Sequence, residues 1–545
     1  MKKIYKSLIV LSCLSMTFAT TSCIDETEPN NVATKKQLAS SATAVQALVA
    51  AMPAMANNFN SMERASGDER HYDYGYSSMM HIRDVMTGDM PIAESNYDQY
   101  SYWEQNMYLG KDYVFSRAMW YFYTKFVQSA NNVLAAVDKE TTEDPIKLYR
   151  GEAYAYRALA YLDMARMYEF LPNDGTKSVN ASGNNVLNLT VPIVTEDATE
   201  FTTRNNPRVS RDSMASFIKS DLDKATKDLT DEVQGDKWQP TLGCVYGLYA
   251  RLYMWLENYE QAALYARKAI ALGKNTPMTR TESLDPSTGF NTVVSSWMWA
   301  EKVQKENQAV QTGIANWTSF MSPEATYGYA GAGVTPEIDA TLYSKIKNTD
   351  YRKLWFIPTN DSLMNEMKFA LNPTTEKSAY KTLVNTPCAG VKFRPGNGDC
   401  ENNQVGSATA YPVMRIEEMY FIEAEAKAHL DATAGKNLLE TFMKTYRDPS
   451  YTCSASSMED VVKEIILQKR IEFWGEGISF FDYKRLNMPV TRSYTGGNWQ
   501  TNVKFNTTTR PAWMNICFPL NEENNNTAIK GFDNPDPSGC YKLAQ

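Results

Sequence analysis

Residues 145–172, PIKLYRGEAYAYRALAYLDMARMYEFLP, hold the pattern on which the rest of the fold depends. No proline interrupts the stretch between its two ends, so it is expected to form one long helix. Its apolar and aromatic side chains follow two stripes at helical spacing, Tyr149, Ala153, Tyr156, Ala160, Met164, Met167 and Leu171, and Tyr154, Ala158, Tyr161, Ala165 and Tyr168. Two stripes cover most sides of a helix. The stretch therefore predicts a core helix whose alanines let neighbouring helices approach and whose tyrosines interlock with them.

Other helices are expected before and after this one, at residues 34–57, 79–85, 113–138, 211–229, 411–430, 437–446 and 456–474. The helix at 113–138 is joined to the helix at 145–172 by a short connection, which makes the two an αα-hairpin. Ser210 is expected to cap the helix that follows it, and Ser456-x-x-Glu459 has the spacing of a capping box.

Residues 240–273 carry small and aromatic residues at positions typical of a tetratricopeptide repeat. These positions fall on both sides of a break at Glu257-Asn258, as in a helix–turn–helix. The usual Trp, Gly and closing Pro of the repeat are not cleanly placed, and a generic antiparallel helix pair explains the segment equally well. A chain of 545 residues needs either a helical array or an elaborated single domain.

Residues 275–410 differ in kind, because they are rich in Gly, Pro, Asn, Thr and aromatic residues. Short helices are expected near 336–347 and 361–367, and short strands at 295–301 and 391–394. A segment this long and irregular is usually functional or disordered, and its many tryptophans and tyrosines argue against disorder. Within this segment Cys388 and Cys400 bracket a Gly/Pro-rich loop and could pair, which the sequence leaves open.

The N-terminus has the pattern of an exported lipoprotein. The first six residues carry three lysines, residues 8–19 are apolar, and Thr20-Thr21-Ser22 precede Cys23. The apolar run is too short to span a membrane stably. Ordinary signal-peptidase cleavage is the alternative, because Thr20 stands where lipoprotein sites usually have leucine. The pattern predicts a signal peptide at 1–22 and a lipidated flexible tether at 23–33, with Cys23 as the anchor.

Charge and motif content exclude several classes of function. The formal net charge is −8, and it becomes −11 without the three lysines of the signal peptide, which disfavours nucleic acid as a partner. The chain has three histidines and no phosphate loop, dinucleotide motif, nucleophile elbow or zinc-protease motif. A histidine-based catalytic site is therefore not expected, and we predict no metal site and no cofactor.

Carboxylates are plentiful enough to leave a glycosidase-type pair open. Four of them crowd one predicted helix, namely Glu417, Glu418, Glu423 and Glu425. A solvated or ion-paired face is the simpler interpretation of this cluster, and we adopt it.

Several stretches, in this order along the chain, resemble the SusD/RagB family of outer-membrane lipoproteins that bind nutrients. They are YRGEAYAYRALAYLDMARMYEFLP, VPIV at 191–194, NNPRVSRDSMASFIKSDLDKA, the tetratricopeptide-like pair, YPVMRIEEMYFIEAEA and QKRIEFWGEGISFFDYKRLN. The last stretch departs from the family at Ser479, where an arginine is common, which puts one structural ion pair in doubt. The residues that match the family's closing motif are Arg470, Glu472, Glu476, Gly477, Asp482 and Arg485.

The resemblance implies an all-α fold of about four tetratricopeptide-like helical hairpins with a long irregular, loop-rich insertion that carries short strands. It implies a single SusD-like domain at 34–545, with the helical body mainly at 34–273 and 411–490. The ligand-binding part is then about 275–410. It also implies no catalysis and a partner, a TonB-dependent SusC-like barrel in the outer membrane.

Aromatic residues in loop sequence are the candidate ligand platforms, because a ring beside Gly, Ser, Asn or Pro is freer to face solvent than one in a helical stripe. The resemblance places ligand residues in the same two regions, before the first hairpin and within the insertion. Packing of a loop onto the body is the alternative for each ring. The candidates are Trp103, Trp317, Tyr327 and Tyr329, with Tyr74 and Asp89 from the N-terminal loop.

The resulting functional hypothesis is a surface lipoprotein that binds an oligosaccharide or polysaccharide and delivers it to the barrel. Peptide binding within the same family is the main alternative, and a scaffolding protein or a glycan-degrading enzyme are the others. We expect the protein to be lipid-anchored at the outer membrane and to face the cell exterior. The helices at 211–229 and 257–271 are expected to face the transporter.

Overall fold

The computed structural model describes residues 42–59, 71–93, 97–230, 237–359, 361–370 and 383–544. The predicted signal peptide at 1–22, Cys23 and the tether at 23–33 lie outside the described residues. In the part that is described, no helix is both long enough and apolar enough to cross a bilayer.

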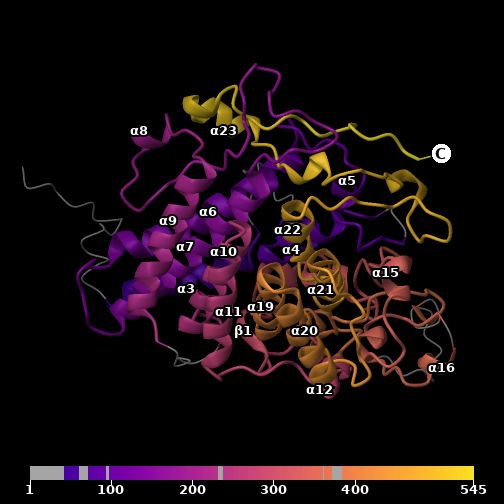
Figure 1. Cartoon of the computed structure of the whole chain (residues 1–545). Helices are drawn as coiled ribbons and strands as arrows, with labels where there is room; N and C mark the ends of the chain where they lie inside the picture. The colour runs from indigo at the N-terminus through magenta and orange to yellow at the C-terminus, as the bar shows by residue number, and fades with distance from the viewer. Residues whose placement is uncertain are drawn as a thin grey trace, which may run out of the picture.

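Helices dominate the described chain (Figure 1). The longer ones are α3 (Ala42–Ala56), α4 (Tyr76–Val85), α6 (Val114–Ala136), α7 (Ile146–Tyr168), α9 (Arg211–Asp228), α10 (Leu242–Trp255), α11 (Tyr259–Ala271), α19 (Ile416–Leu430), α20 (Ala432–Tyr446), α21 (Met458–Glu472) and α22 (Ser479–Arg485). The shorter ones are α5 (Ser101–Glu104), α8 (Glu200–Thr203), α12 (Arg280–Leu284), α13 (Gln308–Gln311), α14 (Trp317–Met321), α15 (Ala340–Ser344), α16 (Asp361–Met364), α18 (Asn403–Gly406) and α23 (Leu520–Asn525). Single 3-10 turns lie at Tyr351–Trp355, Gly396–Gly398, Thr501–Val503, Ala512–Met514 and Thr527–Ile529.

Helix α7 is the centre of the N-terminal half, as its two stripes predicted. It packs against α3, α6, α9 and α10, and nearly all of its side chains from Leu148 to Tyr168 are buried. Burial on most sides explains why the helix carries alanine and tyrosine around its circumference rather than one apolar face. Figure 1 shows α7 among these neighbours on one side of the molecule.

Helical hairpins extend this core. Consecutive helices pair as α6–α7, α10–α11 and α19–α20, and α11 packs against α19 to join the two halves of the body. The prediction of an all-α body of helical hairpins with a loop-rich insertion is confirmed. The N-cap at Ser210 is confirmed too, since its side chain accepts a hydrogen bond from the Ser213 amide. The predicted capping box at Ser456 is wrong, because Ser457 caps α21 by accepting from the Asp460 amide.

The sheet differs from expectation in its second strand. β1 (Trp297–Lys302) pairs antiparallel with β2 (Ala410–Arg415), with Lys302 opposite Ala410. The predicted strand at 391–394 is irregular, and the helix expected from residue 411 starts only at Ile416. Pro412 accounts for this shift, because a proline disfavours the helical conformation of the residue before it.

The insertion is packed despite its irregularity. Trp297, Trp299, Trp317 and Trp355 are all buried in the same hydrophobic core as the helices. Cys388 and Cys400 are free thiols, so they do not form the disulfide that the sequence left open.

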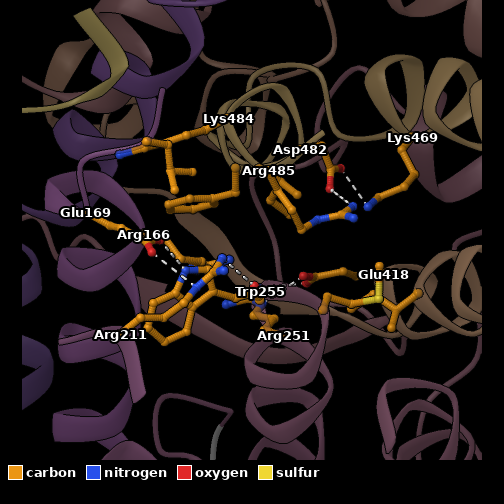
Figure 2. A pocket seen from close by; sticks show the side chains of 15 residues that line it. Arg166, Glu169, Arg211, Arg251, Trp255, Glu418, Lys469, Asp482, Lys484 and Arg485 are labelled. Carbon is orange, nitrogen blue, oxygen red and sulfur yellow. Dashed lines mark hydrogen bonds and ion pairs between the residues drawn. The ribbon is translucent and has the colours of Figure 1, made fainter. Parts of the chain in front are cut away.

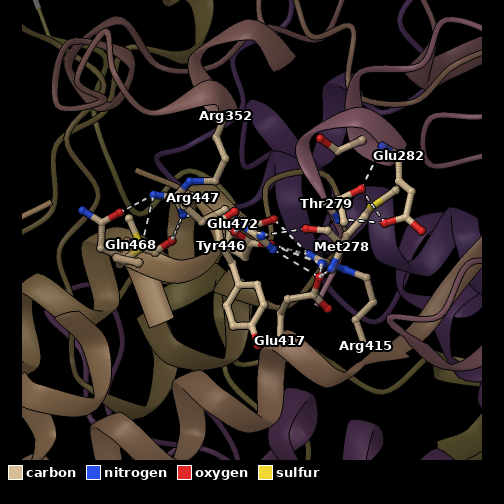
Figure 3. A network of polar contacts seen from close by, with 12 residues as sticks. Met278, Thr279, Glu282, Arg352, Arg415, Glu417, Tyr446, Arg447, Gln468 and Glu472 are labelled. Atoms are coloured by element: carbon tan, nitrogen blue, oxygen red, sulfur yellow. Dashed lines mark hydrogen bonds and ion pairs between the residues drawn. The ribbon is translucent and has the colours of Figure 1, made fainter. Parts of the chain in front are cut away.

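The four glutamates of α19 are ion-paired, as the simpler interpretation allowed, but they are buried, so a solvated face is wrong. Glu418 pairs with Arg251, Glu423 with Arg267, and Glu425 with Lys469 and Arg485. Glu417 enters a larger network around Glu472 of α21, shown in Figure 3. These pairs fasten α19 to α10, α11, α21 and α22, so they hold the two halves of the body together.

Candidate ligand-binding site

Exposed tyrosines gather in the segment that leads into α6. Among the described residues, the four tyrosines with large exposed surfaces are Tyr97, Tyr102, Tyr108 and Tyr113, at 66%, 38%, 41% and 39% exposure. The ring of Tyr108 lies 5.6 Å from that of Tyr102 and 4.9 Å from that of Tyr113, measured between centroids. We call Tyr102, Tyr108 and Tyr113 the tyrosine strip. Exposed aromatic rings gathered in one short segment form a candidate interaction surface.

The loop that carries the tyrosine strip is fixed by the C-terminal segment. Asn106 donates through its side chain to the Pro537 carbonyl at 3.0 Å, and its own carbonyl accepts from the Gly539 amide at 3.2 Å. The Leu109 amide donates to Ser538 Oγ at 2.8 Å. Tyr108 itself has φ of 58°, a conformation rare for a bulky residue. Strained positions of this kind persist where the surroundings enforce them, often at binding sites.

Buried rings support the strip from below. Phe115 stacks on Tyr102 at 4.3 Å between centroids and meets the edge of Trp103 at 4.9 Å. Trp103 also contacts Tyr72 at 5.2 Å. The strip therefore rests on a rigid aromatic layer, which reduces the entropy lost when a ligand binds.

A second stack reaches the surface beside Tyr97. Tyr74 stacks on Phe320 at 5.9 Å, and Phe320 stacks on Tyr329 at 4.8 Å. Tyr329 is half-buried, and its hydroxyl contacts His71. The pKa of Tyr329 is raised, mainly by burial and in smaller part by the neighbouring Tyr97. This brings a residue of the insertion next to the N-terminal loop.

A buried carboxyl pair lies in the same segment. The carboxyl groups of Asp98 and Glu104 lie close enough to interact, and Asp98 accepts a hydrogen bond from the Tyr100 amide at 2.8 Å. Burial raises the pKa of Asp98 to about 6, and burial with the charge of Asp98 raises the pKa of Glu104 well above its usual value. The pair therefore holds a proton at mildly acidic pH, which lets two carboxyl groups share the turn under Tyr102.

The structure corrects the expected exposure of several predicted residues. Trp103, Trp317 and Tyr74 are at most 2% exposed, so the expectation that loop rings face solvent is wrong for these three. Trp317 packs edge-on against Phe393 at 5.0 Å. The physical reason is that the loops fold onto the helical body and bury their largest rings first.

The remaining predicted residues are one buried carboxylate and two half-buried tyrosines. Asp89 is buried and accepts hydrogen bonds from Arg470 and from the Tyr483 hydroxyl, so its carboxylate takes part in contacts inside the protein. Tyr327 is half-buried and packs close to Gly406. Ligand contact by any of the six stays a prediction, and Tyr327 and Tyr329 are the two whose rings reach the surface.

Two family models match the sequence. One, described as starch-binding and associating with the outer membrane, matches residues 25–254, and the SusD family model matches residues 391–527. Together they cover more than half of the chain. The chain belongs to the SusD/RagB family.

Solved structures with the SusD fold agree with this assignment. A SusD-like carbohydrate binding protein from Bacteroides vulgatus ATCC 8482 is 21% identical, with a TM-score of 0.69 over 90% of this chain and 97% of that one. A SusD superfamily protein from Bacteroides thetaiotaomicron VPI-5482 is 16% identical, with a TM-score of 0.66 over 90% and 99%. At such identities the likeness concerns the fold. Among curated proteins, none matches this sequence.

Sequence reasoning about this SusD/RagB family member missed the tyrosine strip. The signal was present in YDQYSYWEQNMYLGKDY (97–113), which combines tyrosines with Asn106 and Gly110 outside any helical stripe. What could not be read locally is which rings the body covers. Within the described residues, no three His, Cys, Asp or Glu side chains are grouped closely enough to hold a metal ion.

Proposed function

We propose that this protein binds an oligosaccharide or polysaccharide on the tyrosine strip and delivers it to a TonB-dependent SusC-like transporter. The observation that carries the proposal is the gathering of all the exposed tyrosines of the described chain between residues 97 and 113. The family description, starch-binding and associating with the outer membrane, supports the ligand class and the location.

The chemistry of a sugar suits such a surface. Sugar rings offer flat C–H faces that stack on aromatic rings, and hydroxyl groups that bond with polar edges. A tyrosine provides both a flat face and a hydroxyl. Because the rings of the strip follow one another along the surface, they suit successive units of a polymer. Tyr97, Tyr329 and Tyr327 would extend the contact toward the insertion, while Trp103 would act through its support of Tyr102.

Calorimetry on single-ring variants tests the site. Tyr108→Ala should weaken binding of the cognate glycan, found among starch fragments and other soluble polysaccharides, by about 1–3 kcal/mol, by analogy with base–aromatic stacking. Its melting temperature should change little, because the ring is exposed. Phe201→Ala is the matched control, since Phe201 on α8 is 86% exposed and lies outside the segment.

Three results would contradict parts of the proposal. Unchanged affinity in both Tyr102→Ala and Tyr108→Ala would place the ligand elsewhere. Binding of peptides with no glycan binding would favour the peptide-binding alternative. Release of a shortened product from a bound polysaccharide would contradict the absence of catalysis.

Lipidation of Cys23 and exposure at the cell surface are part of the proposal. Cys23→Ala should release the protein from the outer membrane, because a lipid chain supplies most of the membrane affinity of an anchored protein. If the variant stays in the membrane fraction of cells that lack the transporter, the lipobox interpretation is wrong. Protease added to intact cells should cleave the native protein if it faces the exterior.

The transporter is proposed to contact the outer faces of α9 and α11. Both helices bury one side against the body and leave the other free, as a broad partner surface requires. Charge reversal at Lys219 and Asp223, an exposed pair on α9, should reduce co-purification with the barrel and leave glycan affinity unchanged. An equal loss of glycan binding would count against this separation of roles.

A further inference from the structure

A charged cavity lies where α7, α10, α19, α21 and α22 meet (Figure 2). Its volume is about 40 Å³, which is room for a few water molecules or one small ion, and too little for a sugar ring. Six basic side chains line it against three carboxylates, Glu169, Glu418 and Asp482. The basic residues are Arg166, Arg211, Arg251, Lys469, Lys484 and Arg485.

Most of these cations form an ion pair with a carboxylate. Arg251 pairs with Glu418 through two bonds of 2.7 and 2.6 Å. Arg211 lies 3.1 Å from Glu169. Lys469 and Arg485 share Asp482 and Glu425, two cations with two carboxylates.

Two cations remain in excess. Arg166 and Arg83 both bind Asp163, at 2.7 and 3.1 Å, so one carboxylate faces two guanidinium groups. Lys484 donates to the Met167 carbonyl at 2.7 Å, and no carboxylate of the described chain pairs with it. Asp84 also lies near Arg83, but burial raises the pKa of its carboxyl well above the usual value. Arginine stays protonated in proteins, so at least one buried positive charge is unmatched even if Lys484 is neutral.

Three guanidinium groups that line the cavity each have a nitrogen to spare. Arg166 uses Nε and Nη2 for the Leu162 carbonyl and Asp163, and Arg251 uses the same two atoms for Val413 and Glu418. Arg485 Nη1 is buried, and it has no acceptor among the described residues. The side chain of Arg485 is 6% exposed, so bulk water does not readily serve it.

We propose that the cavity binds one small monovalent anion, of the size of chloride, among the Nη1 atoms of Arg166, Arg251 and Arg485. The anion would neutralise the excess charge and accept the unused hydrogen bonds. An unpaired charge in the interior is costly, so a bound anion would stabilise the fold. Burial lowers the pKa of Arg166 and of Lys484, which is the response expected of cations without enough counter-charge.

The three arginines that would bind the anion belong to three different helices. Arg166 belongs to α7 in the N-terminal half, Arg251 to α10, and Arg485 to α22 near the end of the helical body. An anion bound by all three would tie the closing helix to the core. This role is independent of glycan binding.

Bromide provides a direct test in the native protein. Crystals grown in sodium bromide should show one anomalous peak in the cavity. In solution, the melting temperature should rise saturably by about 2 °C as chloride replaces gluconate at constant ionic strength. Gluconate is the proper reference because it is an anion too large for the cavity.

A variant separates the site from general salt effects. Arg166→Lys keeps the charge but removes Nη1, and it should raise the chloride concentration at half effect about tenfold. Arg267→Lys is the matched control, because Arg267 pairs with Glu423 outside the cavity and is 49% exposed. Water alone in the cavity would overturn the proposal. A bromide peak without a saturable effect in solution would overturn it as well, since it would indicate an ion bound at crystal concentration only.

Discussion

The network of Figure 3 and the cavity of Figure 2 draw on the same two helices, α19 and α21, but they differ in charge balance. Glu417 and Glu418 are adjacent on α19, and they enter different clusters. In the network, four cations face four carboxylates; the cations are Arg352, Arg415, Arg447 and Lys392, and the carboxylates are Asp350, Glu417, Glu472 and Glu476.

The comparison indicates that buried charged side chains pack closely together where cations and carboxylates are equal in number. Glu472 is within 3.2 Å of Arg352 and Arg415 and within 2.8 Å of Arg447, and its pKa lies far below its usual range because of these arginines, despite burial. Every charge there has a counter-charge, so the side chains pack together. In the cavity the six basic side chains exceed the three carboxylates, and a space of about 40 Å³ remains between them.

The largest effect is expected from breaking the balanced network. Glu472→Gln keeps the shape of the side chain but leaves three buried arginines with too little negative charge. Removing one partner of a buried ion pair typically costs about 3–5 kcal/mol of unfolding free energy. Chemical denaturation measures it, with Glu459→Gln as control because Glu459 pairs with Lys463 on the exposed side of the same helix. A loss below about 1 kcal/mol would mean that the network does not depend on its balance.

The helical part of this architecture was predictable and the charged interior only in part. Two stripes in 145–172 predicted α7, because helical periodicity is a local property. The clustered glutamates of α19 predicted ion pairs, but their partners come from positions as distant as Arg251. Nothing in local spacing shows that Glu417 and Glu418 face opposite clusters, since that depends on how helices pack.

The same limit applies to the ligand site. Trp103 and Tyr108 stand in similar loop sequence, yet one ring is buried and the other is exposed. The loop owes its shape to Pro537 and Ser538, more than 400 residues away along the chain. Composition could place candidates in the right segment. Which of their rings stay exposed depends on a contact between this loop and the C-terminal segment of the chain. β2 was missed for a related reason, because its partner strand lies more than 100 residues earlier.

The next largest effect is expected from Glu152, a buried carboxyl group outside both the network and the cavity. Glu152 on α7 is buried, its Oε2 atom has no hydrogen-bond partner in the described chain, and burial raises its pKa to about 8. The folded state therefore holds a proton that the unfolded state loses near pH 4.5. Stability from this group is fully present below pH 4.5 and is lost as the pH rises toward 8.

Glu152→Gln tests this by removing the titration. Between pH 6 and pH 8, native protein should lose on the order of 2 kcal/mol more than the variant, since each pH unit in this window changes the free energy by about 1.4 kcal/mol. Urea unfolding at three pH values measures the difference, and Glu143→Gln, an exposed residue near the start of α7, is the control. Parallel pH profiles for native protein and Glu152→Gln would refute the raised pKa.

The smallest effect is expected from removing a cation where cations are in excess. Lys484→Met loses one hydrogen bond, to the Met167 carbonyl, and the attraction of Glu169, but it also relieves repulsion by Arg510, Arg208 and Arg211. In a low-chloride buffer these terms should nearly cancel, so the unfolding free energy should change by less than about 1 kcal/mol.

Lys392→Met is the matched comparison, because Lys392 is equally buried but belongs to the balanced network. Its ammonium group donates to Glu476 at 2.6 Å and to the carbonyls of Glu472 and Trp474 at 2.9 and 2.8 Å. The same substitution should therefore cost about 3 kcal/mol or more there, since it leaves Glu476 with less counter-charge. Equal losses in the two variants would show that burial alone, and not the local balance of charge, decides what a lysine contributes in this interior.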